Sequence, residues 1–565
     1  KNLFGMAVMA TALVGCSSSD DLTPNGNEGN QTGAAYASFR INLPTTSGTR
    51  ADDPTPGTPS FDEGTAKEYE VKNGTILIFD NDGKYVTSAQ LGTMNPWTPV
   101  KTDGVTTAAI ATVKLSNVTV GGSYQALVLL NNDVDATTSK VKLPATGVSY
   151  ADWSKEASNV SVENYTKTDY IFMANAPKYT GATSEPTTLV EVNHICASRE
   201  EAQAKAATTV YVERGLAKVT MQDYKTGGYT IADGTTYAGD KVKITDWKLD
   251  VTNKSTYPVH QTGGLLTAWD QIWGTGRFFD NTSSSFKRVY WGVDPNYSGN
   301  ALQSLTACQA AFNMIKNSEV KGEAGMEHPQ YCLENTFDLA NMMQGQTTRV
   351  VFKAVYTPKA LEGTTEKTFY KIGNNTAIWK EADLKQQIKT VALNAMKITD
   401  AVEQAKYVVK LDATENNISG AAGQHLIKAE NITYTGEAAD NKVDPTVVNT
   451  INEKLGLKEE KGKITSGIAT YLHGEAYYIA RVKHFNELTP WTAGTPYDGD
   501  NNAFLGRYGV LRNNWYDLSV ESISGLGYPE VPEVKPTVPD DENDQYINVE
   551  VKILSWAKRS QSIVL

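Results

Sequence analysis

The sequence predicts a mainly β protein with more than one domain. Thr, Val and Tyr are abundant, and 45 Gly and 21 Pro residues are available to separate short strands. The chain has 565 residues, which is too long for one ordinary domain and suggests two or three. Hydrophobic residues make up 40% of the chain and charged residues 21%, so we expect most of it to fold around a core.

The N-terminal segment has the features of an export leader. Residues 3–15 form an apolar run of signal-peptide length, too short to span a bilayer as a helix. Gly15 and Cys16 end the run and polar residues follow, which resembles the lipobox of bacterial lipoproteins, where the Cys thiol is acylated and becomes the new N-terminus. We therefore expect a lipoprotein signal peptide over residues 1–16 with lipidation at Cys16. The alternative is an ordinary signal peptide that contains a cysteine.

A strand is predicted after a flexible tether. Residues 17–33 are rich in Ser, Asn, Gly and Asp, as flexible linkers are. Residues 35–43 alternate between apolar and polar side chains, which is the pattern of a half-buried strand. Its apolar side is formed by Ala37, Phe39, Ile41 and Leu43. Pro44 is expected to end the strand.

An exposed linker with a basic residue follows this strand. Arg50 lies in a stretch rich in Pro, Gly and Thr, which is a favourable site for a trypsin-like protease. Cleavage between Arg50 and Ala51 would make the preceding strand removable, so residues 17–50 would be a tether and a propeptide. The alternative is an ordinary loop arginine.

The C-terminus repeats this arrangement. Four prolines within residues 529–539 predict a stiff, extended linker, and an acidic turn precedes another alternating segment. The side chains predicted to pack from this donor strand and its extension are Tyr546, Ile547, Val549, Val551, Ile553, Trp556, Ile563 and Leu565. Because the linker is expected to hold the strand away from its own domain, pairing with an open sheet edge of a neighbouring copy is favoured. The two terminal strands carry equivalent apolar sets, so one site could accept either; the alternative is two unrelated strands.

The body of the chain consists of short predicted strands separated by turns. Strands are expected over residues 75–79, 124–130, 210–219 and 242–251, a hairpin turn over 80–83, and helices over 198–206, 385–397 and 441–458. A loop rich in Gly and Thr near residues 222–240 is the expected domain boundary. The first domain would then span residues 51–222, the second, with helical insertions, residues 223–528, and the linker with the donor strand residues 529–565.

Three further segments carry a resemblance to a known family. They are residues 212–219 (VERGLAKV), 331–336 (YCLENT) and 506–516 (GRYGVLRNNWY). With the lipobox, they make the chain resemble the Bacteroidota fimbrilins, or type V pilins, and it is similar to the major shaft subunit of short fimbriae. The resemblance implies two β-sandwich domains of transthyretin-like topology, export as an outer-membrane lipoprotein and a place in a cell-surface fimbria.

The resemblance also implies how such a chain assembles. An Arg-specific protease cuts at Arg50–Ala51, the first strand leaves, and the C-terminal strand of a neighbouring copy replaces it. The implied partners are copies of the chain itself, fimbrial anchor and tip subunits, the protease, the outer membrane before cleavage, and host surface molecules met in adhesion and biofilm formation. A chain with both the C-terminal extension and a cleavable Arg resembles a shaft subunit. The alternative is a surface or tip adhesin that binds host glycan or protein, for which Trp491 would be one exposed aromatic.

The sequence contains no recognisable catalytic or metal-binding motif. Its six His residues form no HExxH or other close pair, and no GxSxG, GxGxxG or phosphate-binding glycine loop occurs. We therefore expect no catalytic residue, no cofactor and no metal, and a structural role instead of an enzymatic one. A carbohydrate-active enzyme is the remaining alternative, because its acids leave little local signature. The formal net charge of −12 argues against a nucleic-acid partner.

Four residues of the chain leave their interpretation open. Cys308 and Cys332 lie close enough in sequence to be bridged in an oxidising compartment, but two separate buried thiols fit equally well. Arg507 and Arg512 are interpreted as surface or interface partners in ion pairs.

Overall fold

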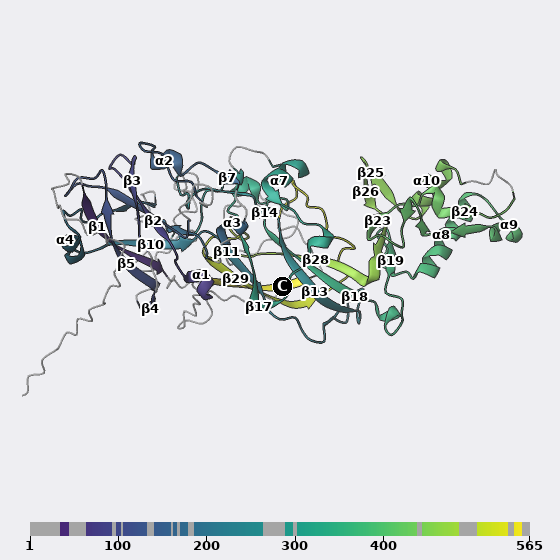
Figure 1. Ribbon diagram of the computed structural model, residues 1–565. Coiled ribbons are helices and arrows are strands. Elements are labelled where there is room, and N and C mark those ends of the chain that lie inside the picture. Colours follow the sequence, from purple (N-terminus) through teal and green to yellow (C-terminus); the bar gives the residue numbers. More distant parts are fainter. Residues whose placement is uncertain are drawn as a thin grey trace, which may run out of the picture.

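The protein is an elongated chain of three parts, seen from left to right in Figure 1 as a first β domain, a second β domain and an insert with helices. The computed structural model describes residues 34–44, 64–92, 98–102, 105–132, 141–159, 162–166, 170–178, 186–263, 289–297, 302–437, 443–484, 505–540 and 547–555. The mainly β fold predicted from composition is confirmed.

The first domain is built on one nine-stranded sheet. Its strands lie in the order β3 (Tyr85–Gln90), β2 (Gly74–Phe79), β6 (Gln125–Leu130), β8 (Met173–Asn175), β10 (Thr208–Arg214), β1 (Ala35–Pro44), β5 (Val105–Leu115) and β4 (Thr98–Thr102), and β9 (Val190–Glu191) pairs with β6. The sheet closes around an apolar cluster to which β1, β2, β5, β6 and β10 contribute, and β3 contacts β5. It therefore forms two packed layers, as a β-sandwich does.

Short helices lie around this sheet. They are α1 (Ala66–Tyr69), α2 (Tyr150–Trp153), α3 (Val162–Thr166) and α4 (Arg199–Ala204). Helix α4 starts where the sequence predicts it, because the Ser198 hydroxyl accepts a hydrogen bond from the Glu201 amide and caps the first turn. The hairpin turn between β2 and β3 is also present: the Asp80 carboxylate accepts from two later amides, and Gly83 has the positive φ that the turn requires.

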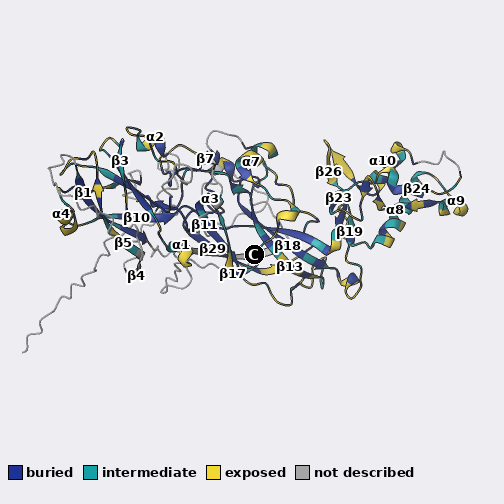
Figure 2. Cartoon of the chain, viewed as in Figure 1, coloured by how far each residue is buried: buried dark blue, intermediate teal, exposed yellow. Residues whose placement is uncertain are grey.

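The second domain is a sandwich of two four-stranded sheets. One has the order β17 (Gly325–Cys332), β11 (Ala217–Met221), β29 (Asn514–Ile523) and β30 (Ile547–Ser555); the other has β12 (Tyr229–Thr230), β13 (Lys241–Asp250), β18 (Arg349–Thr357) and β28 (Glu475–Arg481). Both sheets contribute to one apolar core, with Trp247 and Phe352 from one sheet and Tyr516 and Leu518 from the other. The strands of both domains are mostly buried (Figure 2).

The chain crosses from one domain to the other earlier than predicted. Strand β10 belongs to the first sheet, whereas β11, two residues later, pairs with β17 and β29 of the second domain. The sheets therefore change at Gly215 and Leu216, and not after residue 222. A shared apolar cluster, which includes Phe172, Leu216 and Trp515, packs the two domains against each other.

An insert over residues 369–471 carries its own apolar core at the far end of the second domain (Figure 1). Its helices are α8 (Glu381–Ala395), α9 (Ala401–Ala405) and α10 (Pro445–Lys454), so the two predicted helices are confirmed. Its strands are β19 (Phe369–Ile372), β20 (Tyr407–Val409), β21 (Asp412–Ala413), β22 (Asn416–Asn417), β23 (Gly423–His425), β24 (Ile432–Tyr434), β25 (Lys458–Glu460), β26 (Lys463–Ser466) and β27 (Ile468–Tyr471).

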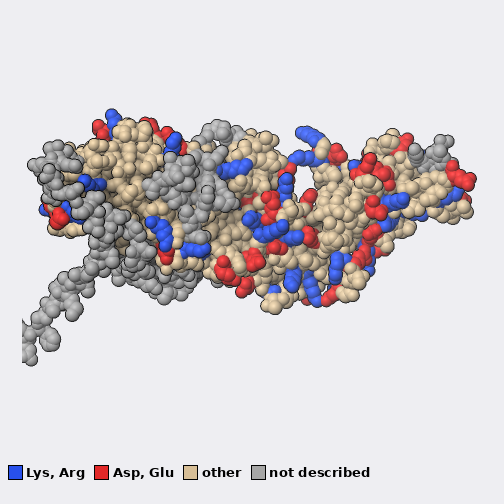
Figure 3. Space-filling model, in the orientation of Figure 1, with Lys and Arg blue, Asp and Glu red and all other residues tan. Residues whose placement is uncertain are grey.

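Smaller elements complete the fold. These are β7 (Ser158–Asn159), which pairs with β15 (Ser255–Thr256), β14 (Thr252–Asn253), which pairs with β16 (Phe312–Asn313), and helix α7 (Leu305–Ala311). None of the helices in the described ranges has the length and apolar character needed to span a bilayer. Basic and acidic side chains are intermixed on the face shown in Figure 3, over the part of the surface that is described.

Candidate functional site

Strand β1 occupies an internal position in the first domain. It pairs antiparallel with β5 along its whole length and parallel with β10 through residues 39–42. The four apolar side chains predicted for this strand each have 0% exposure: Ala37, Phe39, Ile41 and Leu43. We call the place between β5 and β10 the β1 position. If β1 were removed, two strand edges and an apolar layer would be exposed together.

The outer side of β1 is covered near α4. Ser38 is only 7% exposed, and its hydroxyl donates to the Ala202 carbonyl oxygen at 2.8 Å. The same hydroxyl lies 2.8 Å from the hydroxyl of Thr112 on β5. Tyr36 exchanges two backbone hydrogen bonds with Cys196. The β1 position is therefore closed on both edges and, around Ser38, on its outer face.

Helix α1 inserts a carboxylate into the junction between the domains. Glu68 is 1% exposed, its Oε1 atom lies 2.7 Å from the Lys218 ammonium, and the Tyr331 hydroxyl donates to it at 2.7 Å. The Arg214 guanidinium donates to the Glu68 carbonyl oxygen. Burial by itself would raise the pKa of Glu68, but the Lys218 ammonium and these hydrogen bonds outweigh it and lower the pKa. Glu68 therefore remains ionised and joins α1 to both domains.

The three sequence segments of the family resemblance meet at this junction. Residues 212–219 run through the crossing from β10 to β11, and β11 pairs with β17 on one side and β29 on the other. Residues 331–336 and 506–516 supply those neighbours, and an additional bridge links Asn335 with Val510. The Asn513 carboxamide accepts from the Arg214 backbone amide and guanidinium. The segments are thus one structural unit that holds the domains together.

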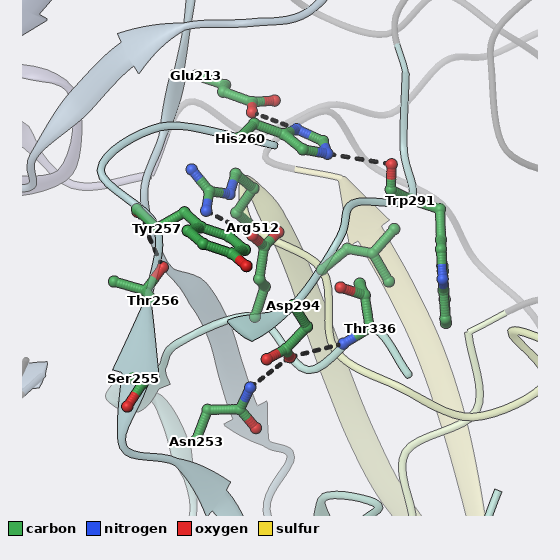
Figure 4. A network of polar contacts seen from close by, with 12 residues as sticks. Glu213, Asn253, Ser255, Thr256, Tyr257, His260, Trp291, Asp294, Thr336 and Arg512 are labelled. Carbon is green, nitrogen blue, oxygen red and sulfur yellow. Dashed lines mark hydrogen bonds and ion pairs between the residues drawn. The ribbon is translucent and has the colours of Figure 1, made fainter. Parts of the chain in front are cut away.

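Buried charged groups lie inside this unit (Figure 4). Arg512 forms an ion pair with Glu334, and the two side chains are 3% and 5% exposed. Burial opposes both charges, but each partner stabilises the other, so the pKa of Arg512 is raised and that of Glu334 is lowered. Arg512 therefore forms an ion pair, as predicted, but this pair is buried within the chain and is not on its surface.

His260 connects the junction between the domains with the segment that contains Trp291. Its Nδ1 atom lies 2.7 Å from the Glu213 carboxylate and its Nε2 atom 3.1 Å from the Trp291 carbonyl oxygen (Figure 4). The His260 ring thus connects β10, which carries Glu213, with the segment that contains Trp291. Sequence reasoning did not find this contact, since a lone His and a Glu in an alternating strand are usually exposed.

Asp294 is a third buried acid of this region. Its carboxylate accepts hydrogen bonds from the Asn253 side chain and the Thr336 amide (Figure 4). It also accepts from the Asn296 backbone and side chain. Burial raises the pKa of Asp294 to about 7, although these N–H groups favour the ionised form. These contacts join Asn253 on β14 to Asn296 and to Thr336, which follows β17.

The C-terminal strand lies on its own chain. Strand β30 is the edge strand of the second domain and pairs antiparallel with β29 along its whole length. The proline-rich segment before it is packed on the same domain: the Pro532 carbonyl accepts from the Arg349 guanidinium, the Val538 carbonyl accepts from the Gln344 amide, and Val534 is 4% exposed. The expectation that the linker holds the strand away from its own domain is therefore wrong for the single chain. Proline lacks a donor, but carbonyl groups in its neighbourhood still accept.

Residues 469–562, which include β28, β29 and β30, match the family model described as major fimbrial subunit protein type IV, fimbrillin, C-terminal. The C-terminal part of the chain is therefore similar to the C-terminal part of fimbrillins. No curated protein matches the sequence. The family that this region matches is one of fimbrial subunit proteins.

Similar solved structures are distant in sequence from this chain. A putative cell adhesion protein from Parabacteroides distasonis is 11% identical, with a TM-score of 0.38, over 93% of this chain and 98% of that one. A tip fimbrial protein from Porphyromonas gingivalis with a C-terminal truncation is 10% identical, with a TM-score of 0.30, over 92% and 100% of the two chains. A fimbrial assembly protein from Parabacteroides distasonis is 14% identical, with a TM-score of 0.23, over 56% and 81%.

The three cysteines in the described part of the chain are separate thiols. Cys308 lies on α7 against Leu302, in a cluster with Phe312, whereas Cys332 ends β17 in the core of the second domain. Cys196, Cys308 and Cys332 are all free and buried, so a Cys308–Cys332 disulfide is excluded in this fold. Burial raises the pKa of Cys308 to about 11 and that of Cys332 to about 12.

Several predicted site residues lie outside the described part of the chain. They are Cys16, Arg50, Ala51, Tyr546, Trp556, Ile563 and Leu565, and Trp491 of the adhesin alternative. For Ile547, Val549, Val551 and Ile553 the structure gives the backbone of β30. Across the described ranges, no three His, Cys, Asp or Glu residues come together as metal ligands.

Proposed function

We propose that this protein is a shaft subunit of a surface fimbria, exported as a lipoprotein through Cys16, cut between Arg50 and Ala51, and assembled by exchange of terminal strands between copies. In this scheme cleavage releases residues 17–50, and the C-terminal strand of another copy enters the β1 position. Anchor and tip subunits would end the filament, and the lipid would hold the precursor at the outer membrane until cleavage.

One observation carries the proposal: β1 has a hydrogen-bonded neighbour on each side, whereas among the described strands β30 has a neighbour on one side only. A strand that leaves β29 for an empty β1 position gains a second set of backbone hydrogen bonds. Each contributes about 1 kcal/mol net. The apolar layer under β1 adds to this, because burial of a large aliphatic or aromatic side chain contributes roughly 1.5–3 kcal/mol. The exchange is therefore favourable once the original strand has gone.

The sequence around the proposed cleavage site supports a single cut. Arg50 is the only Lys or Arg between Pro44 and Lys67. A protease specific for basic residues would therefore separate β1 from α1 at that one bond and leave Glu68 with its contacts at the junction. The body of the subunit would stay folded while β1 is released.

Limited trypsin treatment of the purified full-length precursor tests this scheme. We expect a mass loss that corresponds to cleavage after Arg50, followed by ladders on denaturing gels of unboiled samples. R50Q should resist cleavage and stay monomeric, and a chain that lacks residues 546–565 should be cleaved without forming ladders. Cleaved wild-type protein that has lost residues 17–50 and still remains monomeric would show that the proposed exchange does not occur.

A further inference from the structure

We propose that the incoming strand binds in a single register, in which Asn548 takes the place of Ser38 and determines that register. This inference rests on the proposed strand exchange and adds what selects the alignment of the two copies. In this register Ile547, Val549, Val551 and Ile553 replace Ala37, Phe39, Ile41 and Leu43. A shift by one residue would turn the apolar side outward, so only shifts by two residues compete.

A side chain that takes the place of Ser38 must provide both a hydrogen-bond donor and a hydrogen-bond acceptor. Ser38 donates its single hydroxyl proton to the Ala202 carbonyl, so the Thr112 hydroxyl must donate to Ser38. At 7% exposure, water cannot readily replace either partner. A replacement side chain must therefore donate toward α4 and accept from β5 at once.

A carboxamide meets this demand, because its NH₂ group can donate to the Ala202 carbonyl and its oxygen can accept from Thr112. Asn548 is the residue that the proposed register brings there. A shift by two residues in one direction brings Glu550, whose ionised carboxylate only accepts and would face the carbonyl oxygen of Ala202. The opposite shift brings the large Tyr546 into the space of a serine.

The apolar face selects the same register. In the proposed alignment, four aliphatic side chains enter the layer in which β1 residues are 0% exposed. The shift that brings Glu550 to the place of Ser38 also puts Ser555 at the place of Leu43. The opposite shift puts Gln545 at the place of Ala37. Each competitor therefore buries a polar side chain in the core, which is costly without a partner.

The sequences of the two strands agree with this alignment. The register that sets Asn548 on Ser38 also sets Tyr546 on Tyr36 in the printed sequence. Glu550 falls on the half-exposed Arg40, where water can solvate a charge. Lys552 falls on the buried Asn42, from which its long aliphatic stem can carry the ammonium to water.

Cysteine cross-linking between subunits tests the register directly. Ser38 and Thr112 lie opposite each other on β1 and β5, so a T112C/N548C chain should form disulfides between subunits after cleavage, in a C196S background that removes a nearby thiol. We expect covalent ladders that survive boiling without reductant. T112C/E550C is the matched control and should give at least tenfold less cross-linked product. In the uncut chain β30 lies on β29 in the other domain, so neither pair should link there (Figure 1).

A second series keeps the proposal testable if the cysteine chains assemble poorly. N548S restores the side chain that β1 itself carries and should assemble at close to the wild-type rate, whereas N548D at pH 7 should assemble at least tenfold more slowly. Strong linking through E550C, or equal rates for N548S and N548D, would overturn the register. Absence of ladders in cleaved wild-type protein would instead overturn the proposed strand exchange, so the two failures are distinguishable.

Discussion

The ion pair between Arg512 and Glu334 allows a quantitative test of the junction. R512M removes the cation and leaves the Glu334 carboxylate without this partner. The side chains of Arg512 and Glu334 are 3% and 5% exposed, so the remaining carboxylate is buried. Glu213 also lies close enough for its charge to act on Arg512. Removal of one partner of a buried pair typically costs about 3–5 kcal/mol, because the remaining charge stays buried. We expect a loss of that size in the free energy of unfolding.

The double variant R512M/E334L separates the ion pair from simple packing. Of the two carboxylates that act on Arg512, it removes the one with the larger effect, so we expect it to recover most of the stability lost in R512M, with a coupling energy of about 2–3 kcal/mol. Urea unfolding of the uncleaved protein, followed by tryptophan fluorescence, measures these values; Trp291 and Trp515 lie at the junction. K241M is the matched control, since Lys241 and its partner Glu362 are 52% and 48% exposed and such pairs contribute about 0–1 kcal/mol. If R512M costs no more than K241M, the buried pair does not stabilise the junction.

Three other predictions concern the burial of β1, the charge of Glu68 and the state of the cysteines. F39A should lower the stability of the uncleaved precursor by about 3–5 kcal/mol, because Phe39 is 0% exposed. In the proposed assembly, cleaved fimbriae should be unchanged by F39A, since residue 39 has been released with β1. Equal melting temperatures of wild-type and F39A precursors would contradict this. The pKa of Glu68 is lower in the folded than in the unfolded protein, so its contribution to stability is present above the unfolded pKa of about 4.5 and is lost as the pH falls through the folded pKa. E68Q should remove this part of the acid dependence of the melting temperature. An unchanged pH profile in E68Q would count against this role of Glu68. Denatured protein, kept from oxidation, should titrate as free thiols at Cys196, Cys308 and Cys332, and a mass change on reduction would refute the separate-thiol assignment.

Strand β1 and the two long helices of the insert could be predicted because their side-chain periodicity directly records which face is buried. The crossing between the domains could not. Alternation continues through residues 210–219, and only tertiary pairing assigns β10 and β11 to different sheets. Gly215 at that point has a packing reason: a Cβ atom there would lie 2.9 Å from the Phe172 ring and 3.0 Å from the Tyr165 ring.

The buried charges and the packing of the proline-rich C-terminal segment on its own domain could not be predicted from the sequence for a different reason. A charged residue in an alternating strand normally faces water, and nothing local shows that Arg512 and Glu334 come from segments far apart in the sequence and meet in the interior. The spacing of prolines after residue 528 describes backbone stiffness but not the contacts of the carbonyl groups, so Arg349 as a partner of Pro532 could not be foreseen. Both features depend on long-range contacts.

The direct passage from β10 into β11 has a mechanical consequence. A strand bound in the β1 position lies beside β10, and two residues separate β10 from β11, which is flanked by β17 and β29. Tension applied to a bound neighbour would therefore reach the second domain along the backbone and through side-by-side ladders that must shear as a whole. In the proposed filament, the helical insert would lie away from this line of force, so it could change in length and composition without weakening the contact between subunits.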